Sequence, residues 1–200
     1  MSGSEPPHAG AAMCPDRSWP GCRSKGVWGV RQNPAVTSMG ILTDLEAGMA
    51  ALSTPRRVYV ATGRFTEPDP DLPELAAQIR TLLSEVTEDE AWRRFLLDYD
   101  LPSAPGICAA LEPMETHRAA AFLARLAAVD LLWPSHRHLP IETAERAADR
   151  VVSLLGPEAG WWTNHDDDCG SVNGLTPLFD SLLAGTDGTH FALALQIADD

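Results

Sequence analysis

The chain has 200 residues, an apolar fraction of 44% and a formal net charge of −13. This length and composition are typical of one globular domain with a buried core. The charge is unevenly divided, with +3 over residues 1–65 and −16 over residues 66–200. An acidic surface of this kind repels phosphate backbones and anionic membranes, so we expect neither nucleic acid nor a membrane as a partner. The charge instead favours a basic protein surface or a cation.

Targeting and redox signals are few. No apolar run near the N-terminus resembles a signal peptide. The longest apolar stretch, residues 119–133, is interrupted by Arg125 and Asp130 and is shorter than the roughly 20 residues of a membrane span. The four cysteines match no disulfide or zinc framework: Cys14, Cys22, Cys108 and Cys169. We therefore expect a cytoplasmic protein with reduced thiols.

The first 38 residues are rich in proline and glycine and lack hydrophobic periodicity. This composition is typical of disordered segments, so residues 1–38 are predicted to be a disordered extension. Residues 39–200 are predicted to form a single acidic, mainly helical domain. Whether translation starts at Met1 or at Met39 stays open.

The first half of the domain shows three helical patterns. Apolar residues recur at helical spacing over residues 39–52. A second pattern covers residues 71–86, where Asp71 lies three residues before Glu74 and resembles a capping box. A third helix is expected to begin at the capping box formed by Thr87 and Glu90, and its expected buried residues are Trp92, Phe95 and Leu96.

The second half of the domain shows three more helical patterns. A long helix is expected over residues 113–132, because proline suits a first helical position and the stretch is apolar on most sides. Another is expected over residues 141–155, closed by Gly156. A short last helix is expected to begin at Pro177 and to end at Gly185. The pair Trp161 and Trp162 is interpreted as a hydrophobic anchor in the connection that precedes this last helix.

Two segments have strand character. Residues 58–60 are β-branched and aromatic, and Gly63 ends the run. Over residues 190–198, large apolar residues alternate with alanine and glutamine, which favours a strand with one large and one small face over a helix. These two strands could pair. The fold class predicted from all the elements is mainly α, with five or more helices and a small β element, and α+β is the alternative.

The acidic run that follows Asn164 is the densest group of reactive side chains. The chain contains no GxGxxG, P-loop, GxSxG, HExxH or CxxC motif. If Asn164 opened an EF-hand loop, Asp166 and Asp168 would fall at positions three and five. Cys169 then replaces the required glycine and Leu175 the required glutamate, so the spacing excludes an EF-hand.

A looser metal site is the alternative to a solvated acidic loop. Adjacent carboxylates repel one another, and a divalent cation relieves that repulsion. His136 and His138 form an HxH pair that could bind zinc if a third ligand, such as His117, Cys108 or Cys169, came close. No cofactor is predicted, with Mg²⁺, Ca²⁺ or Zn²⁺ as the alternative. The candidate metal ligands are Asn164, His165, Asp166, Asp168, His136 and His138.

Two functional hypotheses follow. The first is a non-enzymatic module that binds a basic protein through its C-terminal region. Its candidate contact residues are Trp161, Trp162, Asp167, Asp199 and Asp200. The second is a metal-dependent enzyme of the hydrolase type that uses the acidic run 164–168. The first is preferred, because no catalytic motif is present and the charge favours a basic partner.

Overall fold

The computed structural model describes residues 38–67, 70–96, 98–166 and 171–199. The predicted disordered extension therefore lies outside the described residues, except for its last residue, Ser38, which begins the first helix. Over the described residues the chain forms six helices and seven strands. No helix among them is long and apolar enough to cross a membrane.

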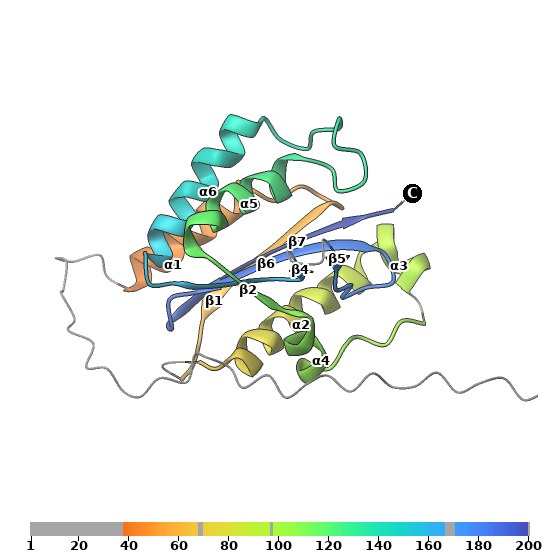
Figure 1. Ribbon diagram of the computed structural model, residues 1–200, viewed down its shortest axis with the longest axis horizontal. Helices are drawn as coiled ribbons and strands as arrows, with labels where there is room; N and C mark the ends of the chain where they lie inside the picture. Colours follow the sequence, from red (N-terminus) through yellow and green to blue (C-terminus); the bar gives the residue numbers. More distant parts are fainter. Residues whose placement is uncertain (1–37, 68–69, 97, 167–170, 200) are drawn as a thin grey trace, which may run out of the picture. The chain divides into compact units, whose positions relative to one another are not determined.

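The centre of the domain is a five-stranded antiparallel sheet (Figure 1). Its strands lie in the order β1-β7-β6-β3-β2. Their bounds are β1 Val58–Arg64, β2 Glu112–Met114, β3 Gly160–Thr163, β6 Phe179–Thr186 and β7 His190–Ala198. The predicted pairing of the first and last strands is confirmed, because Val58 of β1 lies opposite Gln196 of β7. The first and last strands of the domain are therefore neighbours in one sheet.

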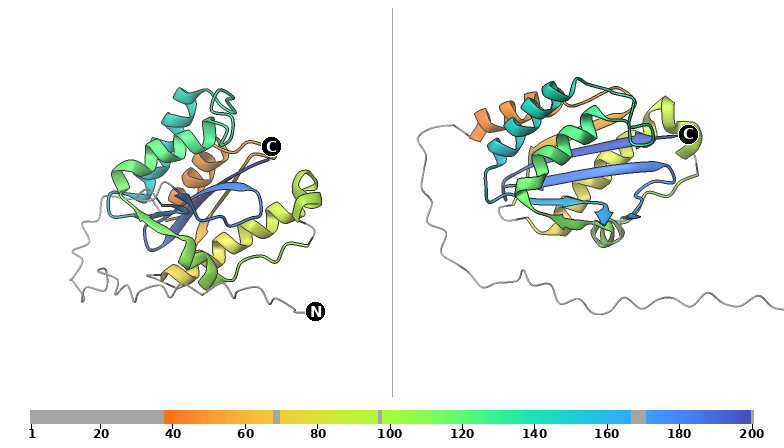
Figure 2. Two further views of the ribbon diagram at one scale, coloured as in Figure 1. Left: turned by 45° about the vertical axis from the view of Figure 1, so that its right-hand side comes forward. Right: turned by 45° about the horizontal axis from the view of Figure 1, so that its top comes forward.

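Helices cover both faces of the sheet (Figures 1 and 2). One face, here called the upper face, packs against α1 (Ser38–Ala50), α5 (Thr116–Ala128) and α6 (Ile141–Leu155). The opposite, lower face packs against α2 (Leu72–Glu88), α3 (Glu90–Leu96) and α4 (Ala104–Ala110). Each face has its own hydrophobic core, so the sheet is buried on both sides.

The alternation in β7 is confirmed as that of a strand. Its large residues point to the lower core: Phe191, Leu193, Leu195 and Ile197. Its small residues Ala192 and Ala194 belong to the upper core. Both sets are buried, because helices cover both faces of the sheet. The small face leaves room for the side chains of the upper helices.

The prediction of a mainly α fold is wrong. Among the described residues, six helices accompany a five-stranded antiparallel sheet, so the fold is α+β, the class predicted as the alternative. The error comes mainly from residues 178–185, where the predicted short helix is instead strand β6 in the middle of the sheet. In a strand buried on both sides, apolar residues follow one another without alternation, and periodicity cannot separate it from a buried helix.

Three further predictions also differ from the structure: the place of Pro113, the cap of α3 and the burial of Phe95. Pro113 lies in the edge strand β2 and not at the start of a helix, a position that suits a residue without an N–H. The cap of α3 is Asp89, whose carboxylate accepts the Ala91 N–H at 2.8 Å, and not Thr87. Phe95 is 39% exposed and lies outside the core. The Asp71 cap is confirmed, because its carboxylate accepts the Glu74 N–H at 3.1 Å.

A short second sheet stands beside the first. It pairs β4 (His165–Asp166) with β5 (Ser171–Val172). Only Asn164 separates β3 from β4, so His165 and Asp166 belong to a strand and not to a loop between two helices. Asp167, Asp168 and Cys169 lie outside the described residues.

Candidate functional site

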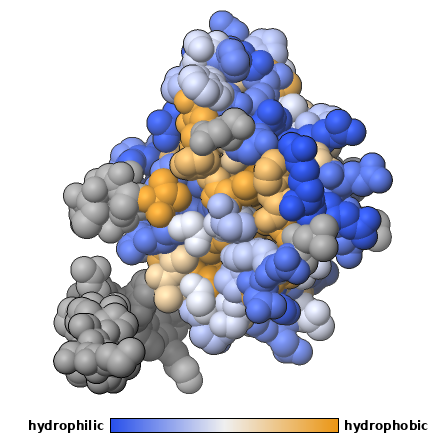
Figure 3. All heavy atoms as spheres, turned by 90° about the vertical axis from the view of Figure 1, so that its right-hand side faces the viewer, coloured by the Kyte–Doolittle hydropathy of each residue, from blue (hydrophilic) through white to orange (hydrophobic). Residues whose placement is uncertain are grey.

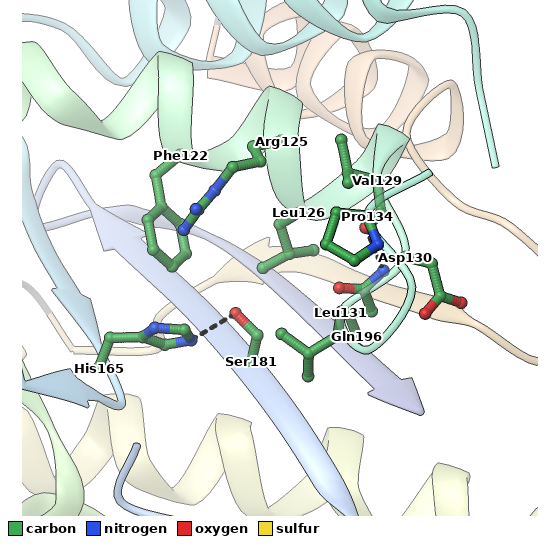
Figure 4. A pocket seen from close by; sticks show the side chains of 10 residues that line it. All are labelled: Phe122, Arg125, Leu126, Val129, Asp130, Leu131, Pro134, His165, Ser181 and Gln196. Atoms are coloured by element: carbon green, nitrogen blue, oxygen red, sulfur yellow. Dashed lines mark hydrogen bonds between the residues drawn. The ribbon is translucent and has the colours of Figure 1, made fainter. Parts of the chain in front are cut away.

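A pocket of about 290 Å³ opens between the upper face of the sheet, the C-terminal half of α5 and the loop that follows it (Figure 4). The helix contributes apolar walls, and the sheet contributes polar groups from β6 and β7. The ten lining residues are Phe122, Arg125, Leu126, Val129, Asp130, Leu131, Pro134, His165, Ser181 and Gln196. This pocket is the candidate site.

A serine and a histidine meet at one side of the pocket. Ser181 is 3% exposed and lies on β6, two residues before Leu183 of the upper core. Its Oγ is 2.8 Å from Nε2 of His165, the interaction drawn as a dashed line in Figure 4. The imidazole also meets the Phe122 ring edge-on, with centroids 5.2 Å apart. These contacts hold the imidazole in one orientation against the pocket.

Two hydrogen bonds through the Thr163 hydroxyl fix the strand that carries the histidine. The His165 N–H donates to Oγ1 of Thr163 at 3.2 Å, and the Thr163 hydroxyl donates to the Leu182 carbonyl at 2.8 Å. Since Leu182 follows Ser181, the same short chain of bonds aligns both partners. A hydroxyl and an imidazole can each donate or accept, so the pair can bind either kind of ligand group.

The two charged residues that line the pocket, Arg125 and Asp130, differ in the partners that their side chains have within the protein. The Arg125 guanidinium lies 5.5 Å from the centroid of the Phe122 ring, and it forms no ion pair with any residue the structure describes. The Asp130 carboxylate accepts the N–H groups of Leu132 and Trp133 at 3.0 and 2.9 Å. Its other oxygen is 3.6 Å from Nε2 of His138. One Asp130 oxygen is therefore occupied by loop N–H groups, whereas Arg125 has no carboxylate partner among the described residues.

Gln196 ties the loop to the floor of the pocket. It is 2% exposed, and its Nε2 donates to the Val129 carbonyl at 2.7 Å. Farther along the loop, the His138 N–H donates to the Ala128 carbonyl at 2.8 Å. The pocket wall is thus held at both of its ends.

Asn164 belongs to a separate buried network. Its Nδ2 donates to the Asp180 carboxylate at 2.6 Å, and its Oδ1 accepts the Leu182 N–H at 2.8 Å. The same carboxylate accepts the N–H groups of Leu175 and Thr176. Burial raises the pKa of Asp180, and these hydrogen bonds oppose that rise. The network holds the connection between β5 and β6 against the strand end.

The other predicted metal ligands lie in different places. His136 is exposed in the loop after α5, and the His138 side chain, 11% exposed, is largely buried beside Asp130. Within the described parts of the chain, no three His, Cys, Asp or Glu side chains come together as a metal site would require. Asp168 and the side chain of Asp166 lie outside these parts, so the metal site that includes them stays a prediction.

The predicted contact residues are also spread out. Trp161 is 2% exposed in the upper core, and Trp162 is half-buried against the lower one. Asp199 is partly exposed and lies 3.4 Å from the Arg57 guanidinium. Asp167 and Asp200 are outside the described residues.

Sequence reasoning missed Ser181, Arg125 and Gln196. Two of these had a visible signal. Gln196 is the one amide on the small-residue face of the alternating segment, and Arg125 interrupts an otherwise apolar stretch. Ser181 had none, because its strand was expected to be a helix.

No family model matches the chain, and neither a curated protein nor a solved structure matches it at a significant level.

Proposed function

We propose that this domain is a cytoplasmic binding module that recognises a basic protein partner. The observation that carries the proposal is that three large apolar side chains stay exposed on segments adjoining the pocket. Trp133 is 57% exposed, Val172 45% and Phe179 50%. Large apolar side chains grouped on a surface are typical of protein-binding sites. We call these three residues the mouth surface.

Their positions along the chain support the grouping. Trp133 precedes Pro134, which lines the pocket. Val172 pairs with His165 across the small sheet, and Phe179 lies two residues before Ser181 on the same strand. Figure 3 views this end of the domain, where apolar side chains gather in the middle and hydrophilic ones surround them. An apolar centre with a polar rim is the usual anatomy of an interface.

Charge supports a basic protein as the partner. The chain carries −13, and arginine–carboxylate pairs neutralise little of it, since the described residues contain only Arg57–Asp199 and Arg150–Asp44 within 4.0 Å. Asp199 follows Ala198, which pairs with Phe179, but Arg57 already pairs with this carboxylate, so the attraction comes from the excess of unpaired carboxylates. Such a surface accelerates association with a positively charged protein and repels nucleic acid.

The test uses the whole chain as bait in an extract of the cells that naturally produce it. Bound proteins are crosslinked chemically and identified. We expect a captured protein of basic isoelectric point, whose purified complex weakens as salt rises. Phe179→Ser and Val172→Ser together should weaken that complex at least tenfold, since central apolar contacts carry most interface energy. Asp199→Lys should weaken it less.

Glu145→Lys, a matched charge reversal on the exposed side of α6, is the control and should change little. Retained affinity in the Phe179→Ser, Val172→Ser variant would contradict the mouth surface as the interface. A captured partner that is acidic, or whose binding ignores salt, would contradict the basic partner.

A further inference from the structure

The pocket itself has a composition that the proposed protein interface does not explain. Its walls are hydrocarbon, from Leu126, Val129, Leu131 and Pro134, with the Phe122 ring at one end. Its volume of about 290 Å³ is near the lower end of the roughly 300–1,000 Å³ that small-molecule pockets span. A ligand that fills it must be small and must have an apolar body.

Three polar side chains of the pocket, those of Arg125, His165 and Ser181, lie on one side. Figure 4 draws the Arg125 side chain extended toward Phe122, with the His165–Ser181 pair below that ring. Ser181 is 3% exposed, so its hydroxyl meets a ligand inside the pocket and not bulk water. The ligand should therefore carry a polar head at one end.

The charge of that head follows from the two charged lining residues. Asp130 already accepts two backbone N–H groups through one oxygen, and Figure 4 shows its carboxylate at the end of the pocket away from Arg125. Arg125 has no carboxylate partner among the described residues and lies on the face of Phe122. Local charge dominates over the acidic surface, because salt screens charges beyond about 8 Å at physiological ionic strength. The head group should therefore be an anion.

We propose that this pocket binds a small monocarboxylic acid. The carboxylate lies between the Arg125 guanidinium and the His165–Ser181 pair, and the hydrocarbon body packs among Phe122, Leu126 and the loop residues. A planar carboxylate fits the fork of one guanidinium through two parallel hydrogen bonds. A single cation in an acidic domain suits a singly charged head better than a doubly charged phosphate.

The probes are benzoate and benzamide, which share a ring and differ in the charge of the head. Titration calorimetry with the whole chain should give a dissociation constant on the order of 1 mM for benzoate, as expected for so small a ligand. Benzamide should bind at least tenfold more weakly. Backbone amide shifts in NMR spectra should move at Ser181, His165 and Leu126.

The variants test whether the Arg125 charge carries the binding, and they are checked for correct folding. Arg125→Gln should remove the preference for benzoate over benzamide, and Arg125→Lys should retain part of it. Ser181→Ala should weaken benzoate severalfold. Arg146→Gln, an exposed arginine on α6, is the matched control and should leave binding unchanged. Melting curves identify any variant that fails to fold.

Three results would overturn the proposal: equal binding of benzoate and benzamide, no saturable binding of either, or an undiminished preference in folded Arg125→Gln. None of them bears on the protein partner, which is tested through the mouth surface.

Discussion

The two faces of the sheet differ in what fills them. Toward α2, α3 and α4, strand β7 presents large side chains such as Leu193 and Leu195. Toward α1, α5 and α6 it presents Ala192, Ala194 and Gln196. The lower core is therefore filled largely from the strands, and the upper core largely from the helices and from Trp161. At the end of the upper face where Ser181 and Gln196 replace apolar residues, the filling is incomplete and the pocket opens.

Close packing and the pocket coexist on the upper face. At its other end the Trp161 ring covers Gly185, where an added Cβ would lie 2.5 Å from the ring. The small face is thus fully occupied at one end and open at the other. A strand face of small residues can therefore serve either packing or binding, depending on which side chains cover it.

The largest expected loss of stability comes from a cavity in the lower core. Leu195 is 0% exposed, and Leu195→Ala leaves a cavity among large neighbours. We expect a loss of about 2–5 kcal/mol in the free energy of unfolding, measured by urea denaturation. Val172→Ala, at an exposed site, should stay within about 0.5 kcal/mol. A loss below about 1 kcal/mol at Leu195 would mean that the lower core relaxes into the cavity.

The opposite change, from a small side chain to a large one, tests how tightly the upper core is packed. Ala194 is 1% exposed, and Ala194→Leu forces three extra carbons between the sheet and its helices. We expect a loss of about 1–3 kcal/mol, because overpacking moves side chains off their preferred rotamers. Ala109→Leu on the exposed side of α4 is the matched control. If Ala194→Leu is neutral, the upper face is less tightly packed than the lower one along its whole length.

The same contrast explains which strands the sequence could predict. In β7, size alternates along the chain, so the period of two is visible even though both faces are buried. In β6, Leu182, Leu183 and Ala184 follow one another with no such alternation, and Leu182 and Leu183 belong to opposite cores. Such a run fits a helix as well as a strand. The helices, with caps such as Asp71 and Gly156, were the more predictable half of the fold.

The site was less predictable for the same reason. His165 was identified as a candidate from its acidic neighbours in the chain, but its partner Ser181 comes from the misassigned strand. Arg125 was read as an interruption of an apolar helix, although it lines the pocket. A pocket built from a helix, a loop and two strands depends on tertiary placement that local patterns do not contain.

A smaller effect, which depends on pH, is expected in the loop that forms the pocket wall. Burial lowers the pKa of His138, with Arg57 and His136 acting in the same direction and Asp130 opposing them. The unfolded chain protonates this histidine near its ordinary pKa of about 6.5, whereas the folded chain does so only at lower pH. The unfolded state therefore binds more protons as pH falls below about 6.5, and stability falls with it.

His138→Gln should remove this contribution. Urea denaturation of the variant between pH 7 and pH 5 should show a smaller loss of stability than the wild type shows. His117→Gln, at a side chain that is 76% exposed, should retain the wild-type slope. Equal slopes for wild type and His138→Gln would contradict the burial argument. Because this loop closes the upper face and not the lower one, acid should loosen the pocket wall first, and amide exchange at Val129 and Asp130 should rise before exchange at Leu193 does.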